Sequence, residues 1–294
     1  MKGLRAKGTS IASVAALTAM ALVGLASCRS AQVYLDPRGP VYTGSWAPPG
    51  PAPGEPLPPA AGFGGSARRL RVVTFNVEYA LRVDQALKAL RENDHLRGAD
   101  LIALQEMDGP GTETIAKGLG LNYVYYPASV HPKYKRDVGN AILTPWPIEE
   151  TFKLPLPHRS RGLRQARLAA VALVRVDGQR LRVYALHLGS PLGASPGQRR
   201  DQIQVVLCDA QDRPDPVIIA GDFNSNGLGD RLVAAGYHWV TRAVGPTTRR
   251  FSFDHVFVKG LPFQETRAGV AREVKDASDH RPVWAEVIPP RRAP

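Results

Sequence analysis

The stretch Val217-Ile218-Ile219-Ala220-Gly221-Asp222-Phe223-Asn224 decides the fold of this chain. Its first four residues predict a buried strand, because the run is apolar, rich in isoleucine and too short for a helix. Asp222 and Asn224 lie two residues apart at the strand end, so both side chains should enter one pocket. The carboxylate can orient or deprotonate water and the amide can donate to a phosphoryl oxygen, a pair suited to work on a phosphate ester. Gly-Asp and Asn also form turns, so the interpretation depends on partners elsewhere in the chain.

Composition limits the kinds of partner. The chain has 294 residues, and 44% of them are hydrophobic, which suffices for two small domains or one large α/β domain. Lys and Arg number 38 against 26 Asp and Glu, which gives a formal charge of +12. Such a charge favours nucleic acid, phosphorylated small molecules or phospholipid head groups. A basic surface without a specific partner is the alternative.

The N-terminus carries a targeting signal. Three basic residues precede an apolar run from Ile11 to Leu25, which is too short to span a membrane comfortably. The run ends in Leu25-Ala26-Ser27-Cys28, which resembles the lipobox of bacterial lipoproteins. The resemblance implies that residues 1–27 are a signal peptide and that several acyl chains on Cys28 anchor the protein stably. No aspartate follows to argue for inner-membrane retention, so we expect a cell-envelope location, at the outer membrane or facing the periplasm. A plain secretory signal with a chance cysteine is the alternative.

Residues 28–67 are predicted to be a lipidated linker. Pro and Gly dominate from Asp36 to Ser66, and such a segment buries too little apolar surface to offset its ordering entropy. It would hold a catalytic domain off the membrane. Tyr34, Tyr42 and Trp46 could instead dock on the domain.

The folded domain is predicted to span residues 68–290. Apolar runs and turn residues predict strands at 70–77, 100–106, 122–128, 138–143, 167–176, 180–188, 217–220, 253–259 and 283–287. Helical spacing predicts helices at 82–94, 112–119 and 196–212. Asp177-Gly178 predicts a tight hairpin, and the excess of strands indicates a mixed α/β domain. Cys208, the second of two cysteines, lies in an apolar helical run and is interpreted as a buried core thiol.

Polar residues recur where the predicted strands begin or end. Each alone is more often a cap or turn residue. Their repeated occurrence at one kind of position, with amides, acids and histidines together, favours a common site. The residues are Asn76, Glu106, His187, Asp222, Asn224, Asp254, Asp279 and His280.

Seven strings give this pattern a family resemblance. TFNV, LIALQE, GNAILTPWPI, YALHL, IIAGDFN, FDHVFV and SDHRPV follow one another between Leu70 and Val287. Together they resemble the endonuclease/exonuclease/phosphatase superfamily, which has the deoxyribonuclease I-like fold. The resemblance implies an α/β (α+β) four-layer sandwich of two packed mixed, mostly antiparallel sheets flanked by helices. It also implies a metal site at the strand ends and hydrolysis of a phosphate ester.

The resemblance assigns a metal site to three residues. Glu106 would be the main ligand, and Asn76 and Asp279 would lie beside it, in contact with the metal or its waters. Carboxylate and amide oxygens suit Mg²⁺, or alternatively Mn²⁺, and the chain has no Cys-His cluster that would argue for zinc.

The resemblance also assigns catalytic roles. Asp222 would position or deprotonate the attacking water, while Asn224 and His187 would donate to the phosphoryl oxygens. Asp254 would fix the tautomer of His280 and raise its basicity. Whether His280 acts as a base or as a protonated phosphate clamp stays open at this point.

Substrate contacts are expected from two further positions. Arg167 begins a strand at the height where this family often places phosphate-contacting basic residues, with salt-bridging as the alternative. Asn140 in the GNAIL string is expected to support the substrate site through hydrogen bonds. His255 neighbours Asp254 on a strand, so its side chain should face the opposite side and be structural.

The sequence therefore predicts a magnesium-dependent phosphodiesterase or phosphatase that is tethered by its lipid outside the inner membrane and hydrolyses a phosphate ester. If the protein is an enzyme, the alternative is a secreted or membrane-anchored nuclease that cleaves DNA or RNA, which the positive net charge favours. If it is not an enzyme, the alternative is a non-catalytic binding module, although no core family residue is missing. We expect a monomer.

Metabolic labelling with a clickable fatty acid tests the lipobox interpretation. The wild-type protein should take up the label, and Cys28→Ala should not, because the acylated sulfur is lost. Cys208→Ala is the matched control and should label like the wild type. Label that persists in Cys28→Ala, or none on the wild type, contradicts the interpretation.

Overall fold

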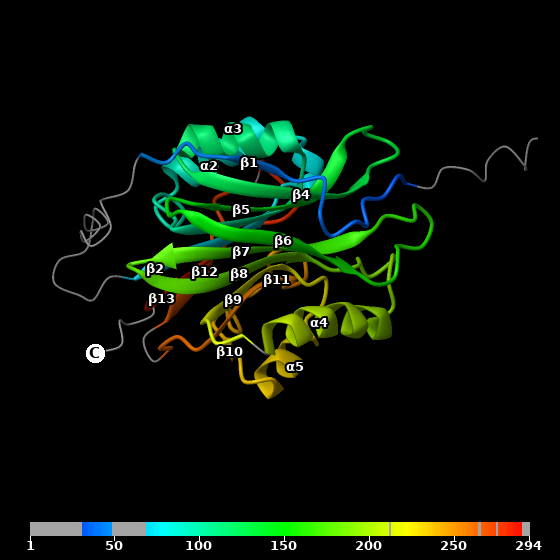
Figure 1. Cartoon of the computed structure of the whole chain (residues 1–294). Helices are drawn as coiled ribbons and strands as arrows, with labels where there is room; N and C mark the ends of the chain where they lie inside the picture. The colour runs from blue at the N-terminus through cyan, green and yellow to red at the C-terminus, as the bar shows by residue number, and fades with distance from the viewer. Residues whose placement is uncertain (1–30, 49–68, 212, 264–265, 275, 290–294) are drawn as a thin grey trace, which may run out of the picture. The chain divides into compact units, whose positions relative to one another are not determined.

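Two β-sheets packed face to face form the centre of the fold, with helices on their outer faces (Figure 1). The computed structural model describes residues 31–48, 69–211, 213–263, 266–274 and 276–289. One compact unit begins at Ala31 and contains both sheets. The predicted signal peptide, Cys28 and residues 49–67 of the predicted linker lie outside the described residues.

The first sheet has seven strands in the order β1-β4-β5-β3-β2-β13-β12. β2 and β3 pair in parallel, and the other neighbours pair antiparallel. The strands are β1 (Tyr42–Gly44), β2 (Leu70–Asn76), β3 (Leu101–Met107), β4 (Asn122–Val130), β5 (Asp137–Thr144), β12 (Arg267–Val270) and β13 (Val283–Val287).

The second sheet has six strands in the order β10-β11-β9-β8-β7-β6. β8 and β9 pair in parallel, and the other neighbours pair antiparallel. The strands are β6 (Ile148–Leu156), β7 (Arg167–Val176), β8 (Gln179–His187), β9 (Val217–Asp222), β10 (His238–Trp239) and β11 (Asp254–Lys259).

The interior strands are buried on both faces. Every residue of β3 and β9 is buried, which explains why both begin as apolar runs without polar alternation and carry polar residues only towards their ends. The layer between the sheets contains Val72 and Ile142 from the first sheet and Ala170 and Ile218 from the second. This central layer sets the distance between the two sets of strand ends.

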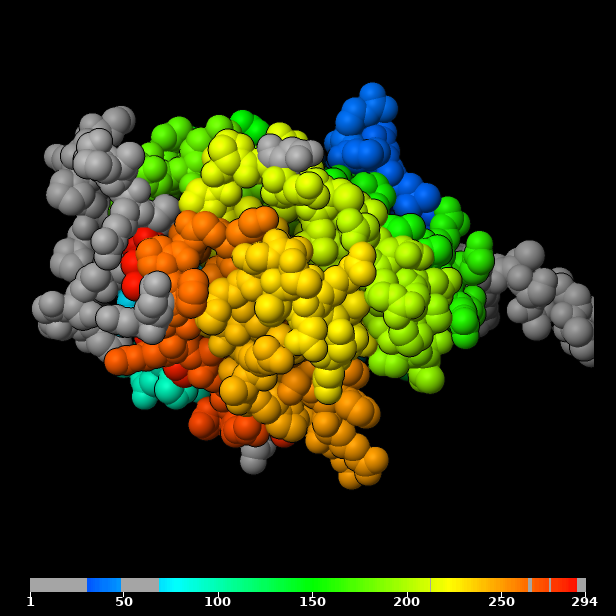
Figure 2. Space-filling view, turned by 90° about the horizontal axis from the view of Figure 1, so that it is seen from below, coloured from blue at the N-terminus to red at the C-terminus, as the bar shows by residue number. Residues whose placement is uncertain are grey.

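Helices complete the four predicted layers, so the predicted sandwich is confirmed. Leu90 and Ile115 pack α2 and α3 on the first sheet, and Ile203 and Leu232 pack α4 and α5 on the second (Figure 1). Figure 2 shows the face of the molecule that the yellow-green and yellow segments around α4 and α5 cover. Within the described residues no helix is long and apolar enough to cross a membrane. The helices are α2 (Val83–Glu92), α3 (Gly109–Leu119), α4 (Pro196–Gln211) and α5 (Gly229–Ala234), with a 3-10 turn η1 (Glu78–Ala80).

The hairpin between β7 and β8 forms as the sequence predicts. Val176 pairs with Gln179 across a two-residue turn. Asp177 and Gly178 both have positive φ, 48° and 81°, as a type I′ turn requires. The β6 strand does not follow from the sequence pattern, because it is an edge strand that contains glutamates, a lysine and Pro155.

Residues 31–48, called the strap below, dock on the domain and differ from the extended linker that their composition predicts. β1 of the strap pairs with β4 and covers the edge of the seven-stranded sheet. The Tyr34 hydroxyl donates to Asp137 at 2.9 Å, and Lys117 lies over the Trp46 ring. Lys153 of β6 is only 1% exposed, because its ammonium donates to strap carbonyls, those of Tyr34 and Gly39, at 3.0 and 2.7 Å.

Cys208 is exposed, so its interpretation as a buried core thiol is wrong. The buried face of α4 instead presents Ile203, Val206 and Leu207, and position 208 is turned toward solvent.

Gly221 offers a test of the β8–β9 packing. Its φ is 153°, and a Cβ there would lie 2.0 Å from the Leu186 carbonyl oxygen. Gly221→Ala should therefore lower the free energy of unfolding by about 3 kcal/mol or more, measured by urea unfolding. Gly227→Ala is the matched control, because its Cβ would approach nothing closer than 4.0 Å. Equal stability of the two variants would contradict the packing described.

Candidate active site

Three neighbouring strands of the second sheet place polar residues side by side. In the register of this sheet, Asp222 of β9 lies between His187 of β8 and Asp254 of β11. β8 and β9 are parallel and end at the same edge, and the antiparallel β11 begins there. Asn76 and Glu106 reach the same place from the ends of β2 and β3 in the first sheet.

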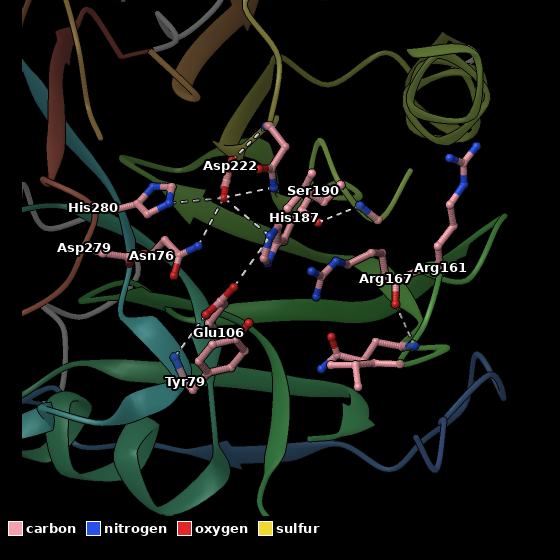
Figure 3. Close-up of a pocket in the computed structure, with 16 residues that line it drawn as sticks. Asn76, Tyr79, Glu106, Arg161, Arg167, His187, Ser190, Asp222, Asp279 and His280 are labelled. Atoms are coloured by element: carbon pink, nitrogen blue, oxygen red, sulfur yellow. Dashed lines mark hydrogen bonds and ion pairs between the residues drawn. The ribbon is translucent and has the colours of Figure 1, made fainter. Parts of the chain in front are cut away.

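These strand ends form the floor of a pocket of about 350 Å³ (Figure 3). Two loops add to its lining, one that leads into β7 and one that follows β8. The sequence-predicted residues that line the pocket are Asn76, Glu106, Arg167, His187, Asp222, Asn224, Asp279 and His280.

The Asp222 carboxylate is 1% exposed and is surrounded by donors. Its Oδ1 accepts the backbone N–H of Asn224 at 2.8 Å. Its Oδ2 accepts from the side-chain amides of Asn76 and Asn224 at 3.1 and 3.2 Å, and His187 Nε2 lies 3.4 Å away. Burial, together with the charge of Asp254, raises the pKa of Asp222 to about 7. This carboxylate can therefore accept a proton near neutral pH.

His280 is held between two carboxylates. Its Nδ1 lies 2.8 Å from Asp254 Oδ2, and its Nε2 lies 3.9 Å from Asp222 Oδ2. The Thr247 hydroxyl donates to the same Asp254 oxygen, so Asp254 stands behind His280 and does not line the pocket. Burial acts to lower the pKa of His280, but the two carboxylates outweigh it and raise that pKa to about 10. His280 is thus an imidazolium that faces Asp222.

Glu106 has a strained backbone, and its buried carboxylate forms no ion pair with a described Lys or Arg. Its φ is 56°, in the left-handed region that non-glycine residues rarely adopt and that is concentrated at functional sites. Oε2 accepts the backbone N–H of Tyr79 at 3.1 Å, and Oε1 lies 3.9 Å from His187 Nε2. Among the described residues no Lys or Arg forms an ion pair with Glu106. Burial raises the pKa of this carboxyl.

His187 differs from His280 in charge. Burial lowers the pKa of His187 well below its ordinary value, and the charges of Arg167 and His280 act in the same direction. His187 is therefore neutral at physiological pH and can donate one hydrogen bond.

Glu106, Asn76 and Asp279 can hold a divalent cation. They line one pocket and supply two carboxylates and an amide oxygen, which are hard donors that fit Mg²⁺ or Mn²⁺. The buried Glu106 carboxylate forms no ion pair with a described Lys or Arg, and the charges of Arg167 and His280 do not offset its burial, so a bound cation would stabilise it. The residues present fit the metal that the sequence predicts.

A second acidic cluster fits proton transfer better than metal binding. Ligand atoms of Asp222, Asp254 and His280 all lie within 4.8 Å of one another. Nδ1 of His280 is already bonded to Asp254, and the raised pKa of this histidine keeps it protonated. A metal needs neutral imidazole, so these groups are arranged to hold a proton.

Arg167 is a buried cation that faces the pocket (Figure 3). The residue is 6% exposed, and its Nε has no hydrogen-bond partner. Within the described part of the chain no carboxylate forms an ion pair with it. A buried guanidinium of this kind is suited to bind an anion such as phosphate.

Asn140 and His255 lie elsewhere. Asn140 Nδ2 donates to the carbonyls of Leu168 and Ala185 at 2.8 and 3.2 Å, so it joins β5 to the opposite sheet. It does not line the pocket, and its expected support of the substrate site through hydrogen bonds stays a prediction. His255 packs against Phe223 and Trp239 on the outer side of the second sheet, as expected for a structural residue.

Sequence reasoning missed several lining residues. Tyr79 lies in a turn where three successive non-glycine residues, 78–80, have positive φ, and no sequence signal marks such a turn. Ser190 and Leu192 belong to a loop whose Gly and Pro content indicates only a turn. Arg161 lies in a basic loop, and its charge gave the one usable signal.

Comparison with known sequences places most of the domain in one family. The profile described as Endonuclease/Exonuclease/phosphatase family matches residues 73–280. A UPF0294 protein of Vibrio vulnificus (strain YJ016) is 34% identical over 117 residues, which are 36% of this chain and 39% of that protein. A UPF0294 protein of Vibrio cholerae serotype O1 (strain ATCC 39315 / El Tor Inaba N16961) is 33% identical over 132 residues, 41% and 45% of the two chains. The matched part is less than half the length of these relatives.

Solved structures share the fold. An endonuclease/exonuclease/phosphatase from Beutenbergia cavernae DSM 12333 has a TM-score of 0.59 and 22% identity, over 76% of this chain and 72% of that one. A mannosyl-6-phosphatase of Bacteroides thetaiotaomicron VPI-5482 has a TM-score of 0.55 and 19% identity, over 74% and 99%. Humanized D. rerio TDP2 has a TM-score of 0.57 and 17% identity, over 74% and 98%. With its sandwich, its strand-end site and the profile match over 73–280, the chain belongs to the endonuclease/exonuclease/phosphatase family.

Proposed function

We propose that this protein is a metal-dependent phosphoesterase that hydrolyses a phosphate ester by in-line attack of an activated water. One observation carries the proposal. The same pocket holds two buried charges, the Glu106 carboxylate, which forms no ion pair with a described Lys or Arg, and the Arg167 guanidinium, which forms none with a described carboxylate. Arg167 acts on Glu106 only from a longer distance, and burial outweighs it and raises the pKa of Glu106. A divalent cation would pair with the Glu106 carboxylate and a phosphate group with the Arg167 guanidinium, because buried charges are stable only when they are paired.

Asp222 is the general base in this proposal. The amides of Asn76 and Asn224 fix the orientation of its carboxylate, and its pKa of about 7 matches proton uptake near neutral pH. Asp222 takes a proton from the water, the water oxygen bonds to phosphorus, and the ester P–O bond on the opposite side breaks. Asn224 also donates to Leu188 O, so we assign it to orienting Asp222 and not to the donor role that the family resemblance implies.

The remaining residues stabilise negative charge on the phosphoryl group. Arg167 and protonated His280 contribute positive charge, and neutral His187 contributes a hydrogen bond. When bound at Glu106, Asp279 and Asn76, a Mg²⁺ or Mn²⁺ ion supplies Lewis-acid stabilisation of the phosphoryl and leaving oxygens.

The lipobox motif extends the proposal to location. Lipid on Cys28 would tether the enzyme in the cell envelope, outside the inner membrane, and its substrate would be a phosphate ester encountered there. The charge of +12 also suits a nucleic-acid substrate, so DNA and RNA belong in the substrate panel.

The base assignment predicts loss of hydrolysis in Asp222→Asn. The turnover of bis(p-nitrophenyl) phosphate with Mg²⁺ should fall at least about a hundredfold, because the amide cannot accept the proton of water. In the wild type the rate should rise with pH as Asp222 loses its proton, with an inflection at or below about pH 7, since a bound cation lowers the pKa of a nearby carboxyl.

The exposed Asp230→Asn variant is the matched control and should keep wild-type turnover. The same panel includes plasmid DNA, RNA, sphingomyelin and inositol phosphates. Full activity of folded Asp222→Asn protein would overturn the mechanism, and turnover of DNA or RNA alone would identify a nuclease.

Metal removal tests the cation site directly. A chelator should abolish turnover, and Mg²⁺ or Mn²⁺ should restore it. Mg²⁺ should also raise the melting temperature of the wild-type protein but not that of Glu106→Gln, because the main ligand charge is lost. Glu113→Gln, an exposed change on α3, is the control and should respond like the wild type. A melting temperature that Mg²⁺ raises equally in Glu106→Gln would contradict the assigned ligand.

A further inference from the structure

Two loops beside the pocket carry side chains that ester hydrolysis does not use. We call residues 157–164 and 189–193 the rim. Leu192 is 93% exposed, more than any other large hydrophobic residue in the described part of the chain, and Leu163 is 41% exposed. Both line the mouth of the pocket together with Arg161. Single exposed apolar side chains are common on protein surfaces, but an almost fully exposed leucine next to a second exposed one at a pocket mouth favours a surface that a partner covers.

The rim is held in place from below by α4. The buried Arg199 side chain donates to the carbonyls of Gly189 and Ala194, at 3.4 and 2.8 Å. Gln202, also buried, accepts the Gly189 N–H at 2.8 Å and donates to the Pro157 carbonyl at 2.9 Å. Leu192 therefore projects from a loop that is fixed at its base, and its exposure is a property of the folded protein.

The rim is positively charged. Arg159, Arg161 and Arg164 are exposed, and none of their side chains forms an ion pair with a described residue. The rim itself contains no Asp or Glu, and the acidic side chain that contacts it among the described residues is Asp201, whose Oδ2 lies 2.8 Å from His158 Nε2. The three arginines therefore leave the rim with an excess of positive charge, which favours an anionic partner.

The strap brings the tether to the same place. The Ala31 N–H donates to the Leu163 carbonyl at 2.9 Å, so the described chain begins at the rim. Cys28 is three residues earlier in the sequence, and three residues span at most about 11 Å. Chain connectivity alone therefore keeps a lipid on Cys28 within about that distance of Ala31, whose N–H contacts the rim.

We infer that the rim docks on an anionic phospholipid bilayer. Leu192 and Leu163 enter the interface, and the three arginines contact lipid phosphates. The pocket then faces the head groups, so the ester it hydrolyses is a phosphate ester of a membrane lipid. This inference rests on the proposed function for its substrate, but the docking itself does not. Nucleic acid fits the rim less well, because the rim contains no Phe, Tyr or Trp on which bases could stack.

Vesicle sedimentation tests the docking without the lipid anchor. Protein lacking residues 1–28 keeps the whole compact unit and should sediment with vesicles of phosphatidylglycerol and phosphatidylcholine, but not with phosphatidylcholine alone. Leu192→Ser and Arg161→Gln should each weaken this binding about five- to tenfold, and added salt should weaken the wild type. The controls Val233→Ser on α5 and Lys88→Gln on α2, which remove an exposed apolar and an exposed basic side chain, should bind like the wild type.

The depth of Leu192 gives a second measurement. In a Cys208→Ser background, an environment-sensitive dye on Leu192→Cys should shift to an apolar emission with anionic vesicles and should be quenched by brominated lipid. The same dye on Val233→Cys should not respond. An unchanged Leu192→Cys signal would overturn the docking geometry even if the protein sediments.

The outcomes separate this inference from the proposed function. Asp222→Asn should bind vesicles like the wild type and hydrolyse neither vesicle phospholipid nor bis(p-nitrophenyl) phosphate. Lack of wild-type binding, or equal binding by the rim variants, would overturn the docking while leaving ester hydrolysis intact. If the protein binds vesicles but hydrolyses only the soluble ester and no phospholipid, the assignment of a lipid substrate would be overturned. Binding of DNA or RNA in place of vesicles, lost in Arg161→Gln, would assign the rim to nucleic acid.

Discussion

The hydrogen bond between Asn76 and Asp222 joins the two sheets at the edge where the site lies. Asn76 ends a strand of the first sheet and Asp222 ends a strand of the second, and both are buried. Breaking such a bond would leave two polar groups without water, so the pairing resists any slide of one sheet over the other. Asn140 adds a second link of this kind, from β5 to carbonyls of the opposite sheet. The geometry of the site therefore depends on the packing of the whole sandwich.

The two pocket histidines show how the fold assigns different tasks to one residue type. Both are buried and both lie near Asp222. The carboxylates of Asp254 and Asp222 raise the pKa of His280, whereas burial, together with the positive charges of Arg167 and His280, lowers the pKa of His187. Burial and neighbouring charges thus shift the two pKa values in opposite directions, so one histidine is a cation and the other a neutral donor.

The sequence predicts the strand-end residues well, because apolar runs that stop at Asn76, Glu106 and Asp222 locate one edge of each sheet. It does not predict the partners of each residue across the sheets, so the position of Asn140 and the unpaired Nε of Arg167 emerge only from the structure. Cys208 was misplaced for a definite physical reason. The inner face of α4 contains Arg199 and Gln202, which obscure the apolar period, so the pattern could not fix which side of the helix is buried.

The strap has a consequence for where the folded unit begins. A fragment that started at residue 68, the domain boundary indicated by composition, would lack the partner strand of β4 and expose an open sheet edge. The Lys153 ammonium would also lose the two hydrogen bonds that it donates to the carbonyls of Tyr34 and Gly39. Such a fragment would be prone to aggregate through strand addition. Although its composition predicts a linker, the strap is a structural part of the domain, which therefore extends to Ala31.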